Sequence, residues 1–299
     1  MANSNGWGDG AANNAIGWGQ GANNNIGWGK SHSLSSAGLT DIVGLTTDSD
    51  AQAFITAAAI TDATQQSAID TLVKGLKTDG IWTKMKAIYP FVGGTASTHK
   101  YNLKDPRDLD AAFRLVFNGG WTHSSTGATP NGTNGYADTK LNPSISLASQ
   151  NSSHMSYYSR TNNDGTYIEM GSNIDAKRIV LHVKYNGDAY YDQNDQTSGG
   201  RLSFSMAAIN SSCFSLMSRT ANNLQIGQVN GINKGINTNT MTSAMPNANI
   251  YVGAFNNSTL IYTNRQCAFS SIGDGLTDTE SANLYTRVQA YQTALSRQV

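Results

Sequence analysis

From Phe91 onward, the chain is interrupted at short intervals by the residue pairs that tight turns require. Gly accepts positive φ angles without strain, and Asn and Asp tolerate them, so such pairs mark places where the chain reverses. Roughly ten short strand-like runs with a turn every ten or so residues predict a mainly β fold, a sandwich or jelly roll. The turn pairs are Gly93-Gly94, Asn118-Gly119, Asn131-Gly132, Asn134-Gly135, Asp164-Gly165, Asn186-Gly187 and Gly199-Gly200.

The runs between the turns alternate apolar and polar side chains, as half-buried strands do. The clearest is Arg178 to Tyr185, and Arg201 to Ile209 follows the same pattern. We expect another strand from Ala112 to Phe117, and a hairpin that joins His154–Arg160 to Thr166–Met170 through the turn at Asp164-Gly165. On the first run, one face is predicted to carry Ile179, Leu181, Val183 and Tyr185.

Helical spacing is confined to residues 47–92 and to the C-terminus. Asp50 is expected to cap a helix through Ile60, and Thr61 or Asp62 a second one with an apolar stripe. The same spacing predicts helix from Ile81 to Tyr89. These helices either pack on the following domain or form a neck that associates between chains. At the C-terminus, a capping box precedes another stripe; the residues concerned are Thr277 and Glu280, then Leu284, Val288, Tyr291 and Leu295.

The first thirty residues repeat one short phrase three times. Each repeat has Trp between two glycines, and an Ile precedes the second and third copies. Such a segment cannot build a core of its own, yet Trp is costly to leave in water. We therefore interpret it as an anchor that docks on a partner; a low-complexity leader is the alternative. The predicted anchoring residues are Trp7, Ile16, Trp18, Ile26 and Trp28, and the predicted divisions are 1–46 (extended anchor), 47–92 (helical neck) and 93–299 (sandwich with C-terminal helix).

Composition excludes several classes of partner. The net charge is zero and only 13% of residues are charged, so no basic surface is expected for nucleic acid. No apolar run is long enough to cross a membrane, and no signal sequence begins the chain. Cys213 and Cys267 are too few for a disulfide framework, and we expect two buried thiols in a protein made in a reducing cytosol.

The chemistry-bearing residues do not form a catalytic pattern. The only glutamates are Glu169 and Glu280, and the second is assigned to the helix cap, whereas glycoside cleavage needs two carboxylates. The run Asp188 to Asp195 resembles half a calcium loop but lacks the final bidentate Glu, so an acidic hairpin is favoured. The five histidines are scattered. We expect no enzyme activity, no metal and no cofactor.

Aromatic side chains among Asn, Asp and Ser remain, and this combination is typical of sugar recognition. Aromatic faces stack on sugar C–H groups, while short polar side chains bind hydroxyls. Adjacent residues of a strand point to opposite faces, so at most one of Tyr157 and Tyr158, and one of Tyr190 and Tyr191, is expected on an exposed face. The predicted glycan-binding residues are Trp121, Tyr136, Tyr157 and Tyr190.

Three stretches give the chain a family resemblance. They resemble parts of tailed-bacteriophage virion and fibre proteins, especially those of phages of Bacteroidetes-type hosts. The three stretches are the leader repeats, the stretch from Ile81 through Pro106 to Ser124, and the segment Phe269 to Leu276. The body of these proteins resembles a concanavalin A-like or laminin G-like sandwich. The resemblance implies a virion protein, made in the host cytoplasm, without naming catalytic residues.

From this resemblance we expect a virion fibre, on head or tail. Residues 1–46 would bind capsid or tail proteins, the chain would associate as a homotrimer, and the sandwich would attach to host surface polysaccharide. A purely architectural capsid decoration or tail component is the alternative. A polysaccharide-cleaving enzyme is the third hypothesis, and the shortage of carboxylates disfavours it.

Overall fold

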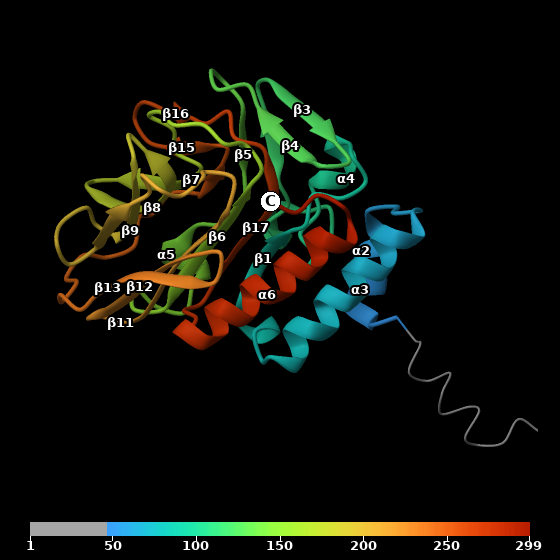
Figure 1. Cartoon of the computed structure of the whole chain (residues 1–299), viewed down its shortest axis with the longest axis horizontal. Coiled ribbons are helices and arrows are strands. Elements are labelled where there is room, and N and C mark those ends of the chain that lie inside the picture. Colours follow the sequence, from blue (N-terminus) through green and yellow to red (C-terminus); the bar gives the residue numbers. More distant parts are fainter. Residues whose placement is uncertain (1–46) are drawn as a thin grey trace, which may run out of the picture. The chain divides into compact units, whose positions relative to one another are not determined.

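The computed structural model describes residues 47–299, which form one compact unit. Two helices precede the first strand, sixteen further short strands and several small helices follow, and a long helix comes last (Figure 1). The helices are α2 (Ser49–Ala57), α3 (Ala63–Thr78), α4 (Ala96–His99), α5 (Pro143–Ser146) and α6 (Asp278–Ala294), with 3-10 turns at Trp82–Lys84 and Asp110–Ala112.

The strands form two sheets, and all pairings are antiparallel except that between β15 and β7. The eight-stranded sheet has the order β13-β12-β11-β6-β17-β4-β3, with β1 beside β17. Its strands are β1 (Met85–Tyr89), β3 (Trp121–Ser124), β4 (Gly127–Pro130), β6 (Ser153–Ser159), β11 (Phe214–Ala221), β12 (Leu224–Val229), β13 (Ile232–Asn237) and β17 (Cys267–Gly273).

The nine-stranded sheet has the order β10-β9-β8-β7-β14-β5-β2, and β15 and β16 extend it beside β7. Its strands are β2 (Val116–Asn118), β5 (Tyr136–Asp138), β7 (Met170–Ile174), β8 (Lys177–Tyr185), β9 (Asp188–Asn194), β10 (Arg201–Ser205), β14 (Tyr251–Val252), β15 (Ala254–Asn256) and β16 (Ile261–Tyr262). The inner faces of the two sheets share one apolar core, to which Tyr157 and Met217 contribute from one sheet and Leu181 and Tyr191 from the other. The predicted β-sandwich is confirmed.

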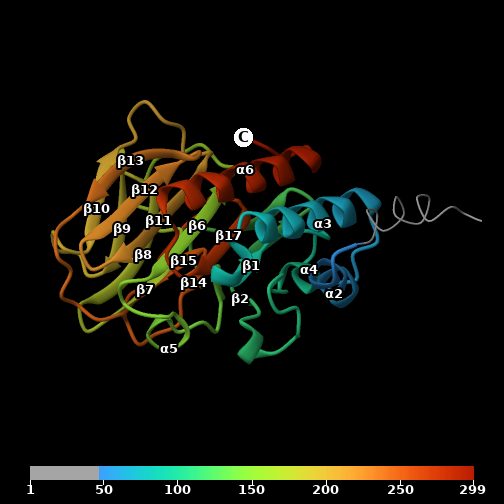
Figure 2. The same cartoon turned by 90° about the horizontal axis from the view of Figure 1, so that it is seen from below.

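A layer of helices covers the outer face of the eight-stranded sheet. α3 and α6 lie side by side (Figures 1 and 2), and Arg287 of α6 binds Asp79 at the end of α3 with Nε–Oδ2 at 2.7 Å. Their apolar stripes form a second core with Tyr158, Phe214 and other outward residues of the sheet. Of the two alternatives for these helices, packing on the following domain is the one that the structure has.

Two predicted elements are wrong. Ile81 to Tyr89 is not helical, because Met85–Tyr89 is strand β1, paired with β17. This strand is buried on both faces, Tyr89 in the sandwich core and Ile88 under the helices, and a short run that is apolar except at Lys86 fits helical and strand spacing equally well. The expected hairpin at Asp164-Gly165 is also absent, since β6 and β7 belong to different sheets. The strand expected from Ala112 to Phe117 begins only at Val116.

The helix caps follow the sequence closely. The Asp62 side chain accepts a hydrogen bond from the Gln65 amide at the start of α3, and Thr277 and Glu280 form the capping box of α6. The first helix is capped by Asp48 rather than by Asp50. Cys213 and Cys267 are both buried free thiols, as predicted.

The anchoring residues Trp7, Ile16, Trp18, Ile26 and Trp28 lie outside the described residues, as does the predicted division 1–46. Within residues 47–299, no helix has both the length and the apolar character needed to cross a membrane.

Candidate functional site

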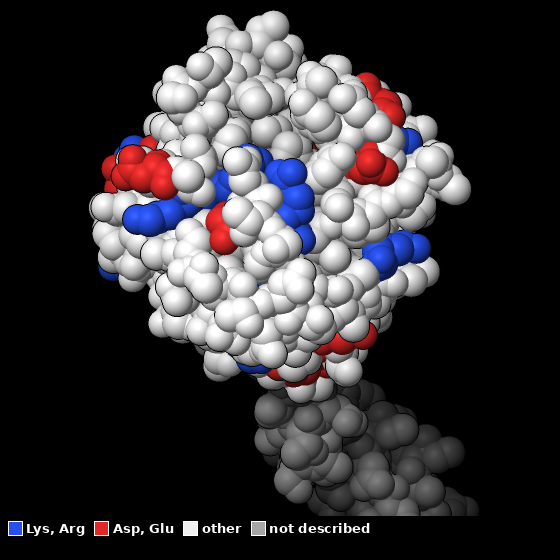
Figure 3. Space-filling model, turned by 90° about the vertical axis from the view of Figure 1, so that its left-hand side faces the viewer, with Lys and Arg blue, Asp and Glu red and all other residues white. Residues whose placement is uncertain are grey.

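A pocket of about 390 Å³ opens on the outer face of the nine-stranded sheet, where β8, β9 and β10 meet the segment around β15 and β16. Figure 3 shows the side of the molecule on which β8, β9 and β15 lie, with Lys and Arg gathered near its middle. The helix layer lies over the other sheet, so this face of the sandwich is left open. The lining residues are Ile168, Arg178, His182, Tyr185, Tyr190, Arg201, Phe255, Asn257 and Ile261.

The aromatic part of the pocket is built by the β8–β9 hairpin. Its turn is Asn186-Gly187, both with positive φ (50° and 91°), as a two-residue hairpin turn requires. The register shifts by one residue between His182 and Tyr185, a β-bulge that turns Tyr185 to the same face as His182. His182 pairs across the strands with Tyr190, and their rings meet edge to face with centroids 5.9 Å apart.

The polar part of the pocket centres on one buried carboxylate. Asp192 of β9 is completely buried and is shared by two arginines. Arg201 donates to it twice, from Nε to Oδ1 at 2.6 Å and from Nη2 to Oδ2 at 2.8 Å. Arg178 Nε lies 2.9 Å from Oδ2 as an ion pair without hydrogen-bond geometry. The guanidinium groups also lie over aromatic rings, Arg178 over Phe255 and Arg201 over Tyr190, each 5.1 Å from the ring centroid.

His182 is the unusual member of the lining. Its side chain is only 5% exposed, and neither ring nitrogen has a hydrogen-bond partner among residues 47–299, although the Tyr167 backbone lies close by. Burial, together with the charges of Arg178 and Arg201, lowers the pKa of His182 to about 3. An unpaired polar group in such a position costs free energy in the empty protein, which a ligand group bonded to it would recover.

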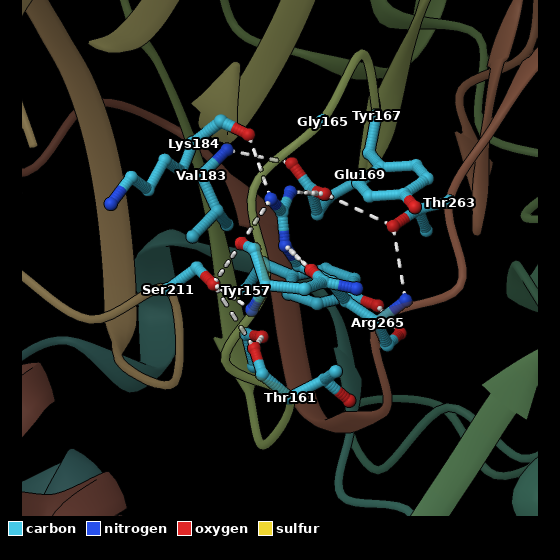
Figure 4. Close-up of polar contacts among 12 residues, drawn as sticks. Tyr157, Thr161, Gly165, Tyr167, Glu169, Val183, Lys184, Ser211, Thr263 and Arg265 are labelled. Carbon is cyan, nitrogen blue, oxygen red and sulfur yellow. Dashed lines mark hydrogen bonds and ion pairs between the residues drawn. The ribbon is translucent and has the colours of Figure 1, made fainter. Parts of the chain in front are cut away.

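A buried ion pair fixes the end of β8 next to the pocket (Figure 4). Glu169 and Arg265 are both fully buried and bind each other. Glu169 accepts from the Val183 amide at 2.6 Å, and Arg265 donates to the Lys184 carbonyl at 2.8 Å. Arg265 also binds the Asn163 side chain and carbonyl. These contacts hold the backbone immediately before Tyr185, and so support the bulge that aims its ring.

The arrangement suits non-covalent recognition of a sugar. Three aromatic side chains offer faces or edges for C–H groups, and the arginines and the Asn257 amide offer hydrogen-bond donors. Ligand pockets generally combine an apolar wall with a few placed polar groups in this way.

Of the predicted glycan-binding residues, only Tyr190 lines the pocket. Tyr190 and Tyr191 divide as strand alternation predicts, because Tyr191 lies in the sandwich core. Trp121 and Tyr136 lie together elsewhere: Trp121 Nε1 donates to the Tyr136 carbonyl at 3.3 Å, and the Tyr136 ring stacks on Tyr251 at 4.6 Å. Both are partly exposed.

The assignment of Tyr157 to a glycan site is wrong. Tyr157 is fully buried in the sandwich core, and its hydroxyl donates to the Arg265 carbonyl at 2.8 Å. Its neighbour Tyr158 is equally buried, since it faces the helix layer. The alternation argument assumed that one face of this strand meets solvent, but the helices cover that face.

The other candidate groups have structural partners. Glu169 is held in its ion pair with no exposed surface, so it cannot contact a substrate. In the run Asp188 to Asp195, Asp192 is bound by arginines and Asp195 accepts from Thr197, and among the described residues no three or more His, Cys, Asp or Glu side chains gather as metal ligands would. The fold does bring His99 and His123 together, with Nδ1 atoms 2.9 Å apart.

Sequence reasoning missed most of the pocket: Arg178, His182, Tyr185, Arg201, Phe255 and Asn257. The Asn186-Gly187 turn was a usable signal, because a two-residue hairpin loop sets the register that places His182 opposite Tyr190. Nothing local signals Phe255, which comes from a strand paired in parallel with β7.

No protein-family model matches the chain, and no curated protein is similar to it in sequence. Among solved structures, it is similar to the binding domain of paraclostridial mosquitocidal protein 1 (TM-score 0.44, 13% identity, 68% of this chain and 52% of that one). It is also similar to the botulinum neurotoxin serotype D binding domain (0.47, 10%, 69% and 52%). This chain thus spans about half the length of these two structures.

A third similar structure is domain 4 of AbnA, a GH43 extracellular arabinanase from Geobacillus stearothermophilus, in complex with arabinotriose (TM-score 0.40, 16% identity, 67% of this chain and 98% of that one). At these TM-scores and identities the likeness concerns the fold alone and says nothing about what this chain binds.

Proposed function

We propose that the chain is a bacteriophage virion fibre or appendage protein whose sandwich attaches to a host surface glycan through the pocket around Tyr190. The observation that supports glycan attachment is this pocket, where three aromatic side chains and several free donors meet on the open face of the sandwich. The virion role, in head or tail, comes from the resemblance of the leader and of the segments near Ile81 and Phe269 to phage virion proteins.

The proposal includes three further points. Residues 1–46 bind capsid or tail proteins, copies of the chain associate as a homotrimer, and the pocket binds without cleaving. Binding without cleavage is supported by the state of the two glutamates, since Glu169 is buried in an ion pair and Glu280 is bound to Lys84 and to its helix cap.

Binding of the full-length protein to host cells and to their extracted surface polysaccharide tests the attachment function. We expect saturable binding that the free polysaccharide competes away, and a loss of at least tenfold in affinity for Tyr190→Ala. Tyr251→Ala is the matched control, because Tyr251 lies on the same sheet and stacks on Tyr136 outside the pocket. Absence of binding by folded protein would leave the architectural role, and a loss confined to the Tyr251 variant would contradict the pocket.

A deletion of residues 1–46 tests the anchor, since residues 47–299 form a compact unit. We expect the shortened protein to fold and to bind polysaccharide, but to be missing from assembled particles. Its normal incorporation would contradict the role given to the leader.

A further inference from the structure

The donors and acceptors of the pocket are unequally matched. Asp192, the carboxylate that binds both arginines of the lining, is not itself a lining residue; it has no exposed surface and already accepts from Arg201 and contacts Arg178. The one side-chain amide of the lining, Asn257, uses its oxygen to accept from Asn173 Nδ2 at 3.0 Å. Asp188 accepts from the Tyr190 hydroxyl at 3.4 Å but does not line the pocket.

Unused donors remain in the same lining. Three donor groups have no partner within residues 47–299: Arg201 Nη1, Arg178 Nη2 and the Asn257 NH₂ group. Arg178 donates only from Nη1, to Gln196. His182 adds a buried ring with no partner in that part of the chain. Two guanidinium groups also share a single carboxylate, which leaves one positive charge uncompensated in the lining.

These observations restrict the chemistry of the ligand. A neutral sugar presents hydroxyl groups, each of which donates as well as accepts, so a site for it needs free acceptors. A pocket with free donors, few free acceptors and one excess positive charge matches an anion, and arginine side chains bind carboxylates with charge-assisted hydrogen bonds.

We infer that the ligand of this pocket is an acidic sugar carrying one negative charge, bound through a carboxylate by Arg178, Arg201 and His182, while Tyr185, Tyr190 and Phe255 contact its ring. This inference rests on the proposed glycan-binding function and adds the class of sugar to it. A sulfate ester also carries one negative charge, and the test below separates the two.

Calorimetric titration of the full-length protein with hexuronate oligosaccharides tests the inference. The probes are oligogalacturonate and unsulfated chondroitin oligosaccharides, each beside its carboxyl-reduced neutral counterpart, and a sulfated chondroitin whose carboxylates are reduced. We expect at least one hexuronate probe to bind saturably, its reduced counterpart to bind at least tenfold more weakly, and the affinity to fall as salt screens the charge.

Arg201→Gln should lower affinity for the hexuronate at least tenfold and affinity for the reduced counterpart much less, because the neutral sugar has no charge for Arg201 to pair with. Arg201 is on an edge strand and partly exposed, and Arg178 remains to bind Asp192, so the variant should fold. Arg201→Lys keeps the charge without the planar group and should lose less. Arg107→Gln, an exposed arginine paired only with Asp105, is the matched control and should change nothing.

The outcomes separate the inference from the function that it rests on. Tyr190-dependent binding of neutral glycans, or equal affinity before and after carboxyl reduction, would overturn the acidic-sugar inference and leave glycan attachment standing. Binding of the sulfated probe alone would assign the charge to a sulfate ester and overturn the carboxylate. Binding of no probe and of no host polysaccharide would overturn both.

Discussion

Replacing Glu169 with Gln should destabilise the protein far more than the loss of one surface carboxylate would. Glu169 and Arg265 are both fully buried, and Glu169 is the only countercharge of Arg265 within residues 47–299. The substitution keeps the size of the side chain but leaves the guanidinium with neutral acceptors only, on Asn163 and Lys184. Removing one member of a buried ion pair typically costs about 3–5 kcal/mol.

For a domain of roughly 250 residues, that cost corresponds to a fall of about 6–20 °C in the unfolding midpoint. Thermal unfolding followed by circular dichroism, with urea denaturation for the free energy, measures it. The matched control is Glu280→Gln, the same change at the chain's other glutamate. Gln preserves the capping box there, and only the half-exposed ion pair with Lys84 is lost, at about 1 kcal/mol or less.

Equal effects of the two substitutions would refute the reasoning, since they would mean that burial of the Glu169 pair adds nothing. A second contradiction would come from activity: if wild-type protein degraded host polysaccharide and Glu169→Gln abolished this while the unfolding midpoint stayed unchanged, Glu169 would be a catalytic carboxylate and not a structural one.

Three further predictions concern the rest of the fold. Gly253→Ala should lower the unfolding free energy by about 1–3 kcal/mol, because Gly253 has φ +84° and an added Cβ would lie 2.7 Å from the Trp121 ring; an unchanged urea midpoint would contradict this. Deleting residues 1–78 should give insoluble protein, since it uncovers one side of α6 and part of the outer face of the eight-stranded sheet, and a soluble, cooperatively unfolding fragment would show that α2 and α3 are dispensable. The free energy of unfolding should fall between pH 7 and pH 5, and urea midpoints that stay constant over this range would contradict this. Burial lowers the pKa of three histidines to about 3 or 4, so below about pH 6.5 these side chains bind protons in the unfolded chain but not in the folded one. Each should lower the free energy of unfolding by about 2 kcal/mol by pH 5. These are His99, His154 and His182.

Local signals predicted the fold where one face of an element lies outside the two large cores. In β8, Ile179, Leu181 and Val183 fill the sandwich core while His182 lines the pocket. The caps at Asp62 and Thr277 were readable because capping depends on a few adjacent residues. The failures, β1 and Tyr157 of β6, lie in strands buried on both faces. These strands do not alternate apolar and polar side chains, because α3 and α6, from distant parts of the chain, form a second core on their outer face.

The candidate site was predicted only in part for a similar reason. Tyr190 was identified as an aromatic residue on a turn-rich stretch, but its partners come from β8, β10 and β15, and only strand pairing brings them together. The bulge that redirects Tyr185 has no signal in the alternation, which placed this ring on the core face.

The order of layers gives the described unit a direction. The chain reaches the unit at Asp48, whose carboxylate binds Lys77 of α3 in the helix layer, whereas the pocket opens on the outer face of the sheet that lies beyond the eight-stranded one. The first described residues and the pocket therefore lie on opposite faces of this unit. A contact at the helix layer leaves the pocket accessible, and where copies of the unit are linked, individually weak contacts at their pockets add up to tight binding of a repetitive polymer.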